Sequence, residues 1–195
     1  MRITGGSWRG RQIAAPRGRD VRPSSDRVRE SLFSILQHND FGRPGGPVLP
    51  GARVLDACAG TGALGIEALS RGAEHATFFD VAGSSLDCVR ENLVMLGAGP
   101  RATVRSTDAT TPPPAKPGEA CDLVLLDPPY RSDVAARALP ALAGRDWLAP
   151  DAIIVIEHGD GEPPEIPDGF TEVDRRSYGT TSLLVLRYEQ PPPIP

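Results

Sequence analysis

Residues 127–130 have the types needed to hold a planar amine. Asp127, Pro128, Pro129 and Tyr130 directly follow the apolar run Leu123–Leu126. An exocyclic amine on an aromatic base is a poor nucleophile because its lone pair is delocalised into the ring. A carboxylate and a proline carbonyl can accept the amine hydrogens, the prolines stiffen the backbone, and a tyrosine ring can stack on the base. Such positioning lowers a barrier by about 7–11 kcal/mol, so methyl transfer would need neither a metal nor a covalent nucleophile. An ordinary proline-rich turn is the alternative interpretation.

A glycine-rich loop lies upstream of this motif, between a predicted strand and a predicted helix. Gly60, Gly62 and Gly65 form a G-x-G-x-x-G pattern, and Asp80 follows Gly60 by twenty residues, at the end of the next predicted strand. In dinucleotide-binding folds this arrangement places pyrophosphate on the loop and a ribose diol on the acidic residue. The loop alone is therefore compatible with an NAD-dependent oxidoreductase, or with tight strand–helix packing and no ligand.

Asp56, four residues before Gly60, favours a different ligand. A carboxylate beside the loop would repel a pyrophosphate, which such loops bind through backbone N–H groups. The same carboxylate would attract the sulfonium and α-ammonium groups of S-adenosylmethionine. The glycines would then let the backbone approach the methionine and ribose parts, and Asp80 would bind the ribose hydroxyls. Asp108, after the third predicted strand, would accept a hydrogen bond from the adenine amino group or face water.

The elements that must position these residues alternate between strand and helix. Predicted strands cover 53–57, 75–80, 102–106, 121–126, 152–158 and, as a final pair turning at 178–179, residues 170–189; predicted helices cover 62–72, 84–97 and 132–144. This alternation is typical of a mostly parallel α/β sheet with helices on both faces, here with an antiparallel edge at the C-terminus. Because ligands of such sheets bind beyond the carboxyl ends of the strands, Asp56, Asp80, Asp108 and Asp127 should meet at one edge.

The region before residue 46 is predicted to be an extension with a different charge. Residues 2–16 predict a β-hairpin, 22–38 a helix capped by Ser24 or Ser25, and 39–52 a Gly/Pro-rich linker. The net charge of the whole chain is −4, but residues 1–30 carry eight arginines and three acidic residues, a net +5 against −9 for the rest. A basic segment on an acidic body can bind phosphates; a solvated arginine-rich terminus is the alternative. The candidate RNA-binding residues are Arg2, Arg9, Arg11 and Arg22.

Composition excludes several other classes of protein. With 195 residues, 39% of them apolar, the chain can build a real core. No stretch approaches the ~18 apolar residues of a membrane span, and no apolar leader begins the chain. The three cysteines and three histidines are scattered without metal-ligand spacing, which fits reduced thiols and structural or surface histidines. We therefore expect a cytoplasmic protein with no membrane contact and no metal.

Five stretches, taken in order, resemble the RsmD family: "MRITGGSWRGRQI", "RPSSDRVRESLFSIL", "LDACAGTGALGIEALSRGA", "DLVLLDPPY" and "YGTTSLLVL". The resemblance covers nearly all of residues 1–188. It implies a Rossmann-like class I S-adenosylmethionine-dependent methyltransferase fold with a mostly parallel seven-stranded sheet. Three departures from the family pattern are visible. Cys58 stands where an aromatic residue is common, Asp80 where glutamate is common, and Ser24-Ser25 where threonine is common.

The resemblance also implies a domain division and a substrate. Residues 1–45 would form the hairpin and helix extension, 46–190 the methyltransferase domain, and 191–195 a Pro-rich tail. The implied target is the N2 amine of a guanine in 16S rRNA, within the small ribosomal subunit, with S-adenosylmethionine as cofactor and a monomeric enzyme. Three alternatives stay open: another planar amine (adenine N6, cytosine N4 or glutamine), an NAD-linked oxidoreductase, and an RNA-binding protein without catalysis.

Overall fold

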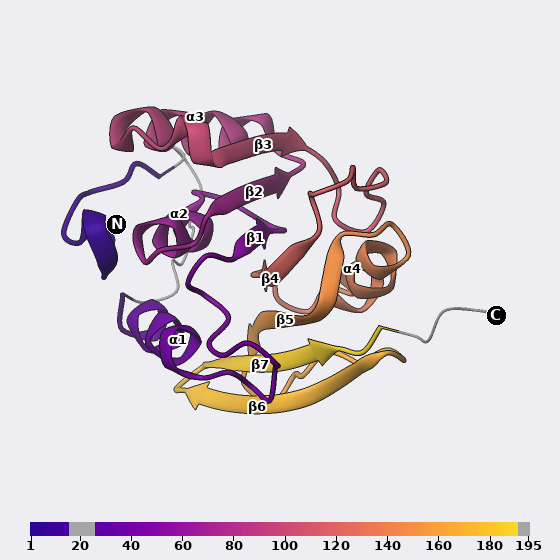
Figure 1. Cartoon of the computed structure of the whole chain (residues 1–195). Helices are drawn as coiled ribbons and strands as arrows, with labels where there is room; N and C mark the ends of the chain where they lie inside the picture. The colour runs from indigo at the N-terminus through magenta and orange to yellow at the C-terminus, as the bar shows by residue number, and fades with distance from the viewer. Residues whose placement is uncertain (16–25, 191–195) are drawn as a thin grey trace.

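The computed structural model describes residues 1–15 and 26–190 and arranges them around a seven-stranded sheet (Figure 1). The strands are β1 (Arg53–Asp56), β2 (His75–Asp80), β3 (Ala102–Ser106), β4 (Cys121–Leu126), β5 (Leu148–Gly159), β6 (Phe170–Tyr178) and β7 (Thr181–Tyr188). Their order across the sheet is β3-β2-β1-β4-β5-β7-β6. Strands β1 to β5 are parallel, and β7 runs antiparallel to both neighbours. This order confirms the predicted Rossmann-like sheet with its antiparallel C-terminal edge.

Helices cover both faces of the sheet, as the strand–helix alternation predicts. The helices are α1 (Asp26–His38), α2 (Ala63–Ser70), α3 (Gly83–Leu96) and α4 (Val134–Ala143), with short 3-10 turns at Gly6–Trp8 (η1) and Gly99–Arg101 (η2). Apolar side chains of α1, α2 and α3 share one core layer with β1, β4 and β5. Those of α4 pack with Trp147 in a second layer on the other face, and Figure 1 shows the two groups of helices on opposite sides. None of the helices in the described part of the chain is long and apolar enough to cross a membrane.

The strand order reverses between β1 and β4, and this reversal fixes where a ligand can bind. From β1 the chain builds outward through β2 to β3, then returns to place β4 on the other side of β1. The connecting segments diverge at such a point, so they leave a crevice above the carboxyl ends of the two central strands. Both strands are buried on each face, which accounts for their continuous apolar sequences.

The N-terminal segment differs from the predicted hairpin. Residues 1–15, the N-terminal arm, fold back on themselves through backbone hydrogen bonds such as Ile3 N to Arg11 O at 3.0 Å and Ile13 N to Met1 O at 3.0 Å. The ladder is reduced to one antiparallel bridge, between Arg2 and Gln12, and η1 occupies the tip. The arm is therefore an irregular hairpin with little strand pairing, and contacts with the body also hold it.

Strand β5 begins four residues earlier than predicted. Leu148 pairs with Cys121, after which the register between β4 and β5 shifts before the pair Leu123–Ile153. Asp151 has a φ of +57°, so the polar interruption in the sequence marks an irregularity inside the strand rather than its start. The predicted caps Ser24 and Ser25 and the Pro-rich tail 191–195 lie outside the described residues.

Candidate active site at the carboxyl ends of the strands

The four aspartates predicted to meet at one edge all lie near enough to Cys58 to affect the pKa of its thiol. Asp56 ends β1, Asp80 ends β2, Asp127 follows β4, and Asp108 lies two residues beyond β3. Burial raises the pKa of the Cys58 thiol to about 12, and the negative charges of Asp56, Asp127, Asp80 and Asp108 add to the shift. A strand-end position thus places all four carboxylates close enough to act on one central group. The resulting electrostatic field suits a cationic ligand.

Asp56 is the most deeply buried of these carboxylates, at 1% exposed. Its Oδ2 accepts a hydrogen bond from the Gly65 backbone N–H at 2.9 Å. Its Oδ1 is buried and has no hydrogen-bond partner within the described ranges. Burial raises the pKa of Asp56 to about 7, the Gly65 N–H opposes this rise, and the charge of Asp80 adds to it. An unsatisfied buried oxygen is costly unless a ligand group satisfies it.

The glycine loop is held in shape by Asp80. Gly60 and Gly62 have φ values of +53° and +76°, in the left-handed region that favours glycine. The Gly60 N–H donates to Asp80 Oδ2 at 2.8 Å, and Asp80 Oδ1 accepts from Ala82 N at 2.8 Å. A Cβ on Gly60 would face open space, so this position can admit a ligand. At Gly65 a Cβ would lie 2.4 Å from the Phe78 ring, so that glycine serves packing and not ligand approach, in contrast to our interpretation of the sequence.

Asp108 is exposed at the edge of the site. Its Oδ1 accepts hydrogen bonds from both the backbone N–H and the hydroxyl of Thr110, each at 2.8 Å. These bonds hold the pKa of Asp108 below its usual range, and Arg137 nearby adds to the effect. Asp108 is therefore charged near neutral pH, and its second oxygen remains available to a donor such as an adenine amine.

Asp127 lies next to a second carboxylate that the motif alone did not reveal. Burial, together with the charges of Glu157 and Asp56, raises the pKa of Asp127 well above its usual range. The register of β4 and β5 pairs Leu126 with Ile156, so Asp127, the first residue after β4, lies beside Glu157, which is still within β5. Side chains at matched positions of neighbouring strands point to the same face. Glu157 is 6% exposed.

A small cavity lies beside the Asp-Pro-Pro-Tyr loop. Its volume is about 130 Å³, and its lining includes Pro128, Pro129, Tyr130, Glu157 and His158. Tyr130 contributes to this lining and is itself 50% exposed to solvent. His158 Nδ1 donates to the Gly159 carbonyl at 2.8 Å, which fixes the orientation of the ring. The Nε2 of this ring is buried without a partner among the described residues, although the sequence suggested only a structural or surface histidine.

The four candidate RNA-binding arginines have different surroundings. Arg2 is largely exposed and forms an ion pair with Asp26 at 3.0 Å. Arg11 donates from Nη2 to the Met95 carbonyl at 2.7 Å, which ties the N-terminal arm to α3. Arg9 is exposed and makes no ion pair within residues 1–15 and 26–190. Arg22 lies outside the described residues. Arg9 is thus the best placed of the described three to receive a phosphate.

The chain is similar to known proteins over nearly its whole length. The family model described as conserved hypothetical protein 95 matches residues 1–187. Ribosomal RNA small subunit methyltransferase D of Escherichia coli (strain K12) is 38% identical over 157 residues, 80% of this chain and 74% of that protein. The protein of the same name from Haemophilus influenzae is 33% identical over 186 residues, 93% of this chain and 91% of that protein. The solved structure of the Escherichia coli protein yhhF, described as a candidate methyltransferase, has a TM-score of 0.78 at 33% identity, with 97% of this chain and 98% of that chain covered.

Proposed function

This chain belongs to the conserved hypothetical protein 95 family, the RsmD family, and we propose that it is an S-adenosylmethionine-dependent methyltransferase acting on the N2 amine of a guanine in small-subunit (16S) ribosomal RNA. The observation that carries the proposal is the position of Asp127. It follows β4, the strand beside β1, and the register pairs Leu125 with the buried Asp56, so Asp127 lies two residues beyond Asp56 at the same edge of the sheet. An amine-binding carboxylate and a cation-binding carboxylate thus share one crevice.

The residues present fit S-adenosylmethionine better than a dinucleotide. The unpartnered Asp56 Oδ1 is a buried acceptor beside the loop, where it would repel a pyrophosphate and attract a cation. Gly60, with open space at its Cβ position, would lie against the ligand, and Asp80 and Asp108 would accept hydrogen bonds from the ribose and adenine. When bound, the cofactor supplies an electrophilic methyl group on its sulfonium.

Asp127 and the Pro128 carbonyl would accept the two hydrogens of the target amine. This grip directs the nitrogen lone pair toward the methyl group, whereas resonance would otherwise delocalise it into the π system of the ring. The amine must also release a proton during methylation. The raised pKa of Asp127 suits its carboxylate to take up that proton. Tyr130, with half of its side chain exposed, would stack on the base, which must be unpaired or flipped out to reach the crevice.

The second carboxylate favours guanine over the other bases. Guanine carries a donor, N1–H, beside its amine, whereas adenine and cytosine carry an acceptor nitrogen at the equivalent position. Glu157, adjacent to Asp127, would bind a donor and repel an acceptor, and His158, whose Nε2 has no partner among the described residues, lines the same cavity. The cavity wall therefore supplies the discrimination between amines that Asp127 to Tyr130 cannot supply alone.

The experiment is to incubate unmodified small ribosomal subunits with the protein and methyl-labelled S-adenosylmethionine, digest the RNA, and identify the labelled nucleoside by mass spectrometry. We expect N2-methylguanosine, and none with the matched variant Asp127→Ala. Label on adenosine, cytidine or protein would contradict the guanine assignment, and no transfer to any acceptor would contradict the methyltransferase assignment. Glu157→Gln should lower transfer to guanine more than it lowers cofactor affinity. Tyr130→Ala should weaken RNA binding by about 1–3 kcal/mol, and Tyr130→Phe should not.

A further inference from the structure

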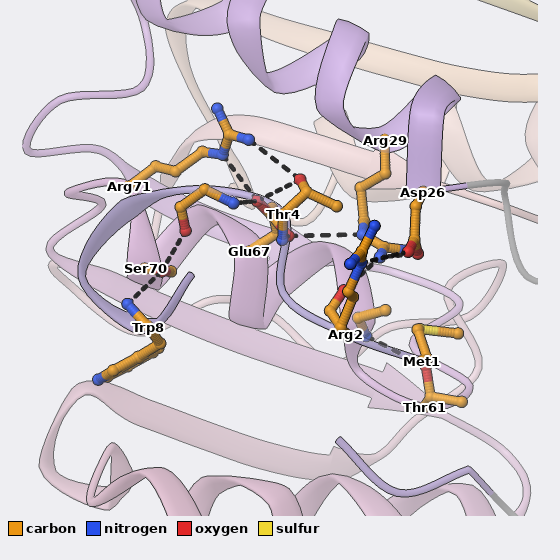
Figure 2. A network of polar contacts seen from close by, with 12 residues as sticks. Met1, Arg2, Thr4, Trp8, Asp26, Arg29, Thr61, Glu67, Ser70 and Arg71 are labelled. Atoms are coloured by element: carbon orange, nitrogen blue, oxygen red, sulfur yellow. Dashed lines mark hydrogen bonds and ion pairs between the residues drawn. The ribbon is translucent and has the colours of Figure 1, made fainter. Parts of the chain in front are cut away.

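A fully buried carboxylate on α2 holds the N-terminal arm. Glu67 is 0% exposed, and it accepts hydrogen bonds from Thr4 N, Thr4 Oγ1 and Gly5 N at 2.7–2.8 Å. Its charge is balanced by Arg71, whose Nε lies 2.7 Å away, and by Arg29, whose Nε lies 3.4 Å away (Figure 2). Because an unpaired buried charge is strongly destabilising, the arm is part of what makes this carboxylate tolerable.

The glycines of the arm allow this close approach. A Cβ on Gly6 would lie 1.9 Å from the Ser70 carbonyl oxygen, and one on Gly5 would lie 2.3 Å from the Arg71 guanidinium. Ser70 Oγ also donates to the Gly5 carbonyl at 2.6 Å and accepts from Trp8 N at 3.0 Å. The docked arm therefore has a defined position against the helix that begins at the glycine loop.

Both ends of the arm reach the glycine loop itself, at Thr61. Asn92 of α3 is 0% exposed. Its Oδ1 accepts from Ala14 N at 2.8 Å, while its Nδ2 donates to the Ala14 and Thr61 carbonyls, each at 3.1 Å. At the other end of the arm, the Met1 sulfur lies 3.9 Å from Thr61 Oγ1. One side-chain amide thus joins the arm to the residue between Gly60 and Gly62.

A displacement of Thr61 would shift the proposed cofactor-binding groups on both sides of it in the chain. The Gly60 N–H is fixed by Asp80, and α2 starts directly after Gly62 with its Gly65 N–H on Asp56. The basic side chains of the arm also depend on docking, since Arg11 reaches the Met95 carbonyl only while the arm lies on α3. The docked arm accordingly accompanies a fixed loop and fixes the position of Arg11 on α3.

We propose that Asn92 couples RNA binding by the N-terminal arm to cofactor binding by the glycine loop. The inference rests on the proposed function, because it takes RNA phosphates and the cofactor as the two ligands. Each ligand binds the docked arrangement better than a loosened one, so each raises the affinity for the other. Asn92 is a positioning residue in this scheme, since it is not required to touch either ligand.

The test is a binding cycle with S-adenosylhomocysteine, which has no methyl group to transfer, and an unmodified small-subunit rRNA transcript. Calorimetric titration gives the dissociation constant of S-adenosylhomocysteine with and without saturating RNA. For the native protein we expect RNA to tighten S-adenosylhomocysteine binding by about fivefold or more. The reverse titration, RNA into protein with and without S-adenosylhomocysteine, should give the same factor.

Two variants weaken the link to different extents. Asn92→Ala removes the bridge, and Ala14→Pro removes the arm N–H that donates to Asn92 Oδ1 while Asn92 Nδ2 keeps its bonds to the Ala14 and Thr61 carbonyls. Both should bind each ligand alone; Asn92→Ala should lose most of the coupling factor, and Ala14→Pro should lose part of it. The matched control is Leu142→Ala, a cavity in the opposite core layer, which should lower the melting temperature and keep the coupling.

The outcomes are distinguishable. Independent binding of the two ligands to the native protein, or full coupling in both variants, would overturn the inference and leave the proposed function intact. Loss of coupling in Leu142→Ala to the same extent as in Asn92→Ala would also overturn it, because the effect would then follow stability alone. Failure of S-adenosylhomocysteine to bind the native protein at all would overturn the proposed function and this inference with it.

Discussion

The pKa of Asp56 leads to a quantitative prediction about cofactor binding and pH. Burial raises this pKa to about 7, so near neutral pH the free protein holds Asp56 as a mixture of neutral and charged forms. A cationic cofactor should bind the charged form. Its affinity should therefore rise with pH up to about 7 and then level off.

The size of the effect follows from the titration of one group. With a pKa of about 7, roughly nine-tenths of Asp56 is charged at pH 8 and roughly one-tenth at pH 6, which gives about a tenfold change in affinity, or ~1.4 kcal/mol. Calorimetric titration of S-adenosylmethionine at pH 6, 7 and 8, in buffers of different ionisation enthalpy, measures both the affinity and the protons released. About half a proton should leave the protein on binding at pH 7.

The variant Asp56→Asn separates charge from shape. Its amide oxygen keeps an acceptor for the Gly65 N–H, so the loop should hold its position, while the affinity falls and its dependence on pH flattens. Without ligand, the native protein should lose stability as pH rises from about 4 to about 7, because the folded state keeps the Asp56 proton that the unfolded chain has released. That slope should shrink in the variant. Equal native affinities at pH 6 and pH 8 would refute the reasoning.

Three further predictions concern the amine site and the N-terminal arm. Asp127→Ala should lower turnover by about 10²–10³-fold with cofactor affinity almost unchanged, and Asp127→Asn should be milder because an acceptor remains; full activity of the alanine variant in single-turnover assays would remove Asp127 from the mechanism. Gly6→Ala should lower the melting temperature more than Gly10→Ala, since both glycines have positive φ but only a Cβ at position 6 meets the body; equal losses would argue against the close approach. Arg9→Ala should flatten the salt dependence of RNA binding by about one unit of slope, whereas Arg11→Ala should also lower the melting temperature because Arg11 bonds α3; an unchanged slope for Arg9→Ala would show that it contacts no phosphate.

The sheet could be predicted closely because its central parallel strands are short and mostly buried, and β3, although only partly buried, is a short strand between two loops. The predicted bounds 75–80, 102–106 and 121–126 are those of β2, β3 and β4. The carboxylates at their ends could be predicted too, since strand ends in such a sheet share one edge. The conformation of the N-terminal arm could not be predicted from its own sequence pattern, because side chains 62 to 78 residues away hold it in place. The sequence does mark Glu67 as unusual, because it is the single acidic residue within the apolar helix α2.

The site residues that sequence reasoning missed lie on β5. Glu157 and His158 appear as the polar end of an apolar strand, and their types suggest nothing unusual. Their importance depends on which strand lies beside β4, and the order of strands is a property of the whole fold. With that order in hand, period-two alternation places Glu157 on the same face as Asp127. The proximity of Glu157 to Asp127 could thus be inferred only from the topology of the sheet.

The bond between Ala14 and Asn92 also has a consequence during synthesis on the ribosome. The arm is translated before the residue that anchors its end, which follows 78 positions later. At translation rates of about 5–20 residues per second, the arm must wait roughly 4–16 s before Asn92 exists. Such non-local contacts form late because their loop-closure cost comes before their gain. The basic arm is therefore exposed to the surrounding RNA of the ribosome while it waits, and its docking should be one of the last folding events of the N-terminal half.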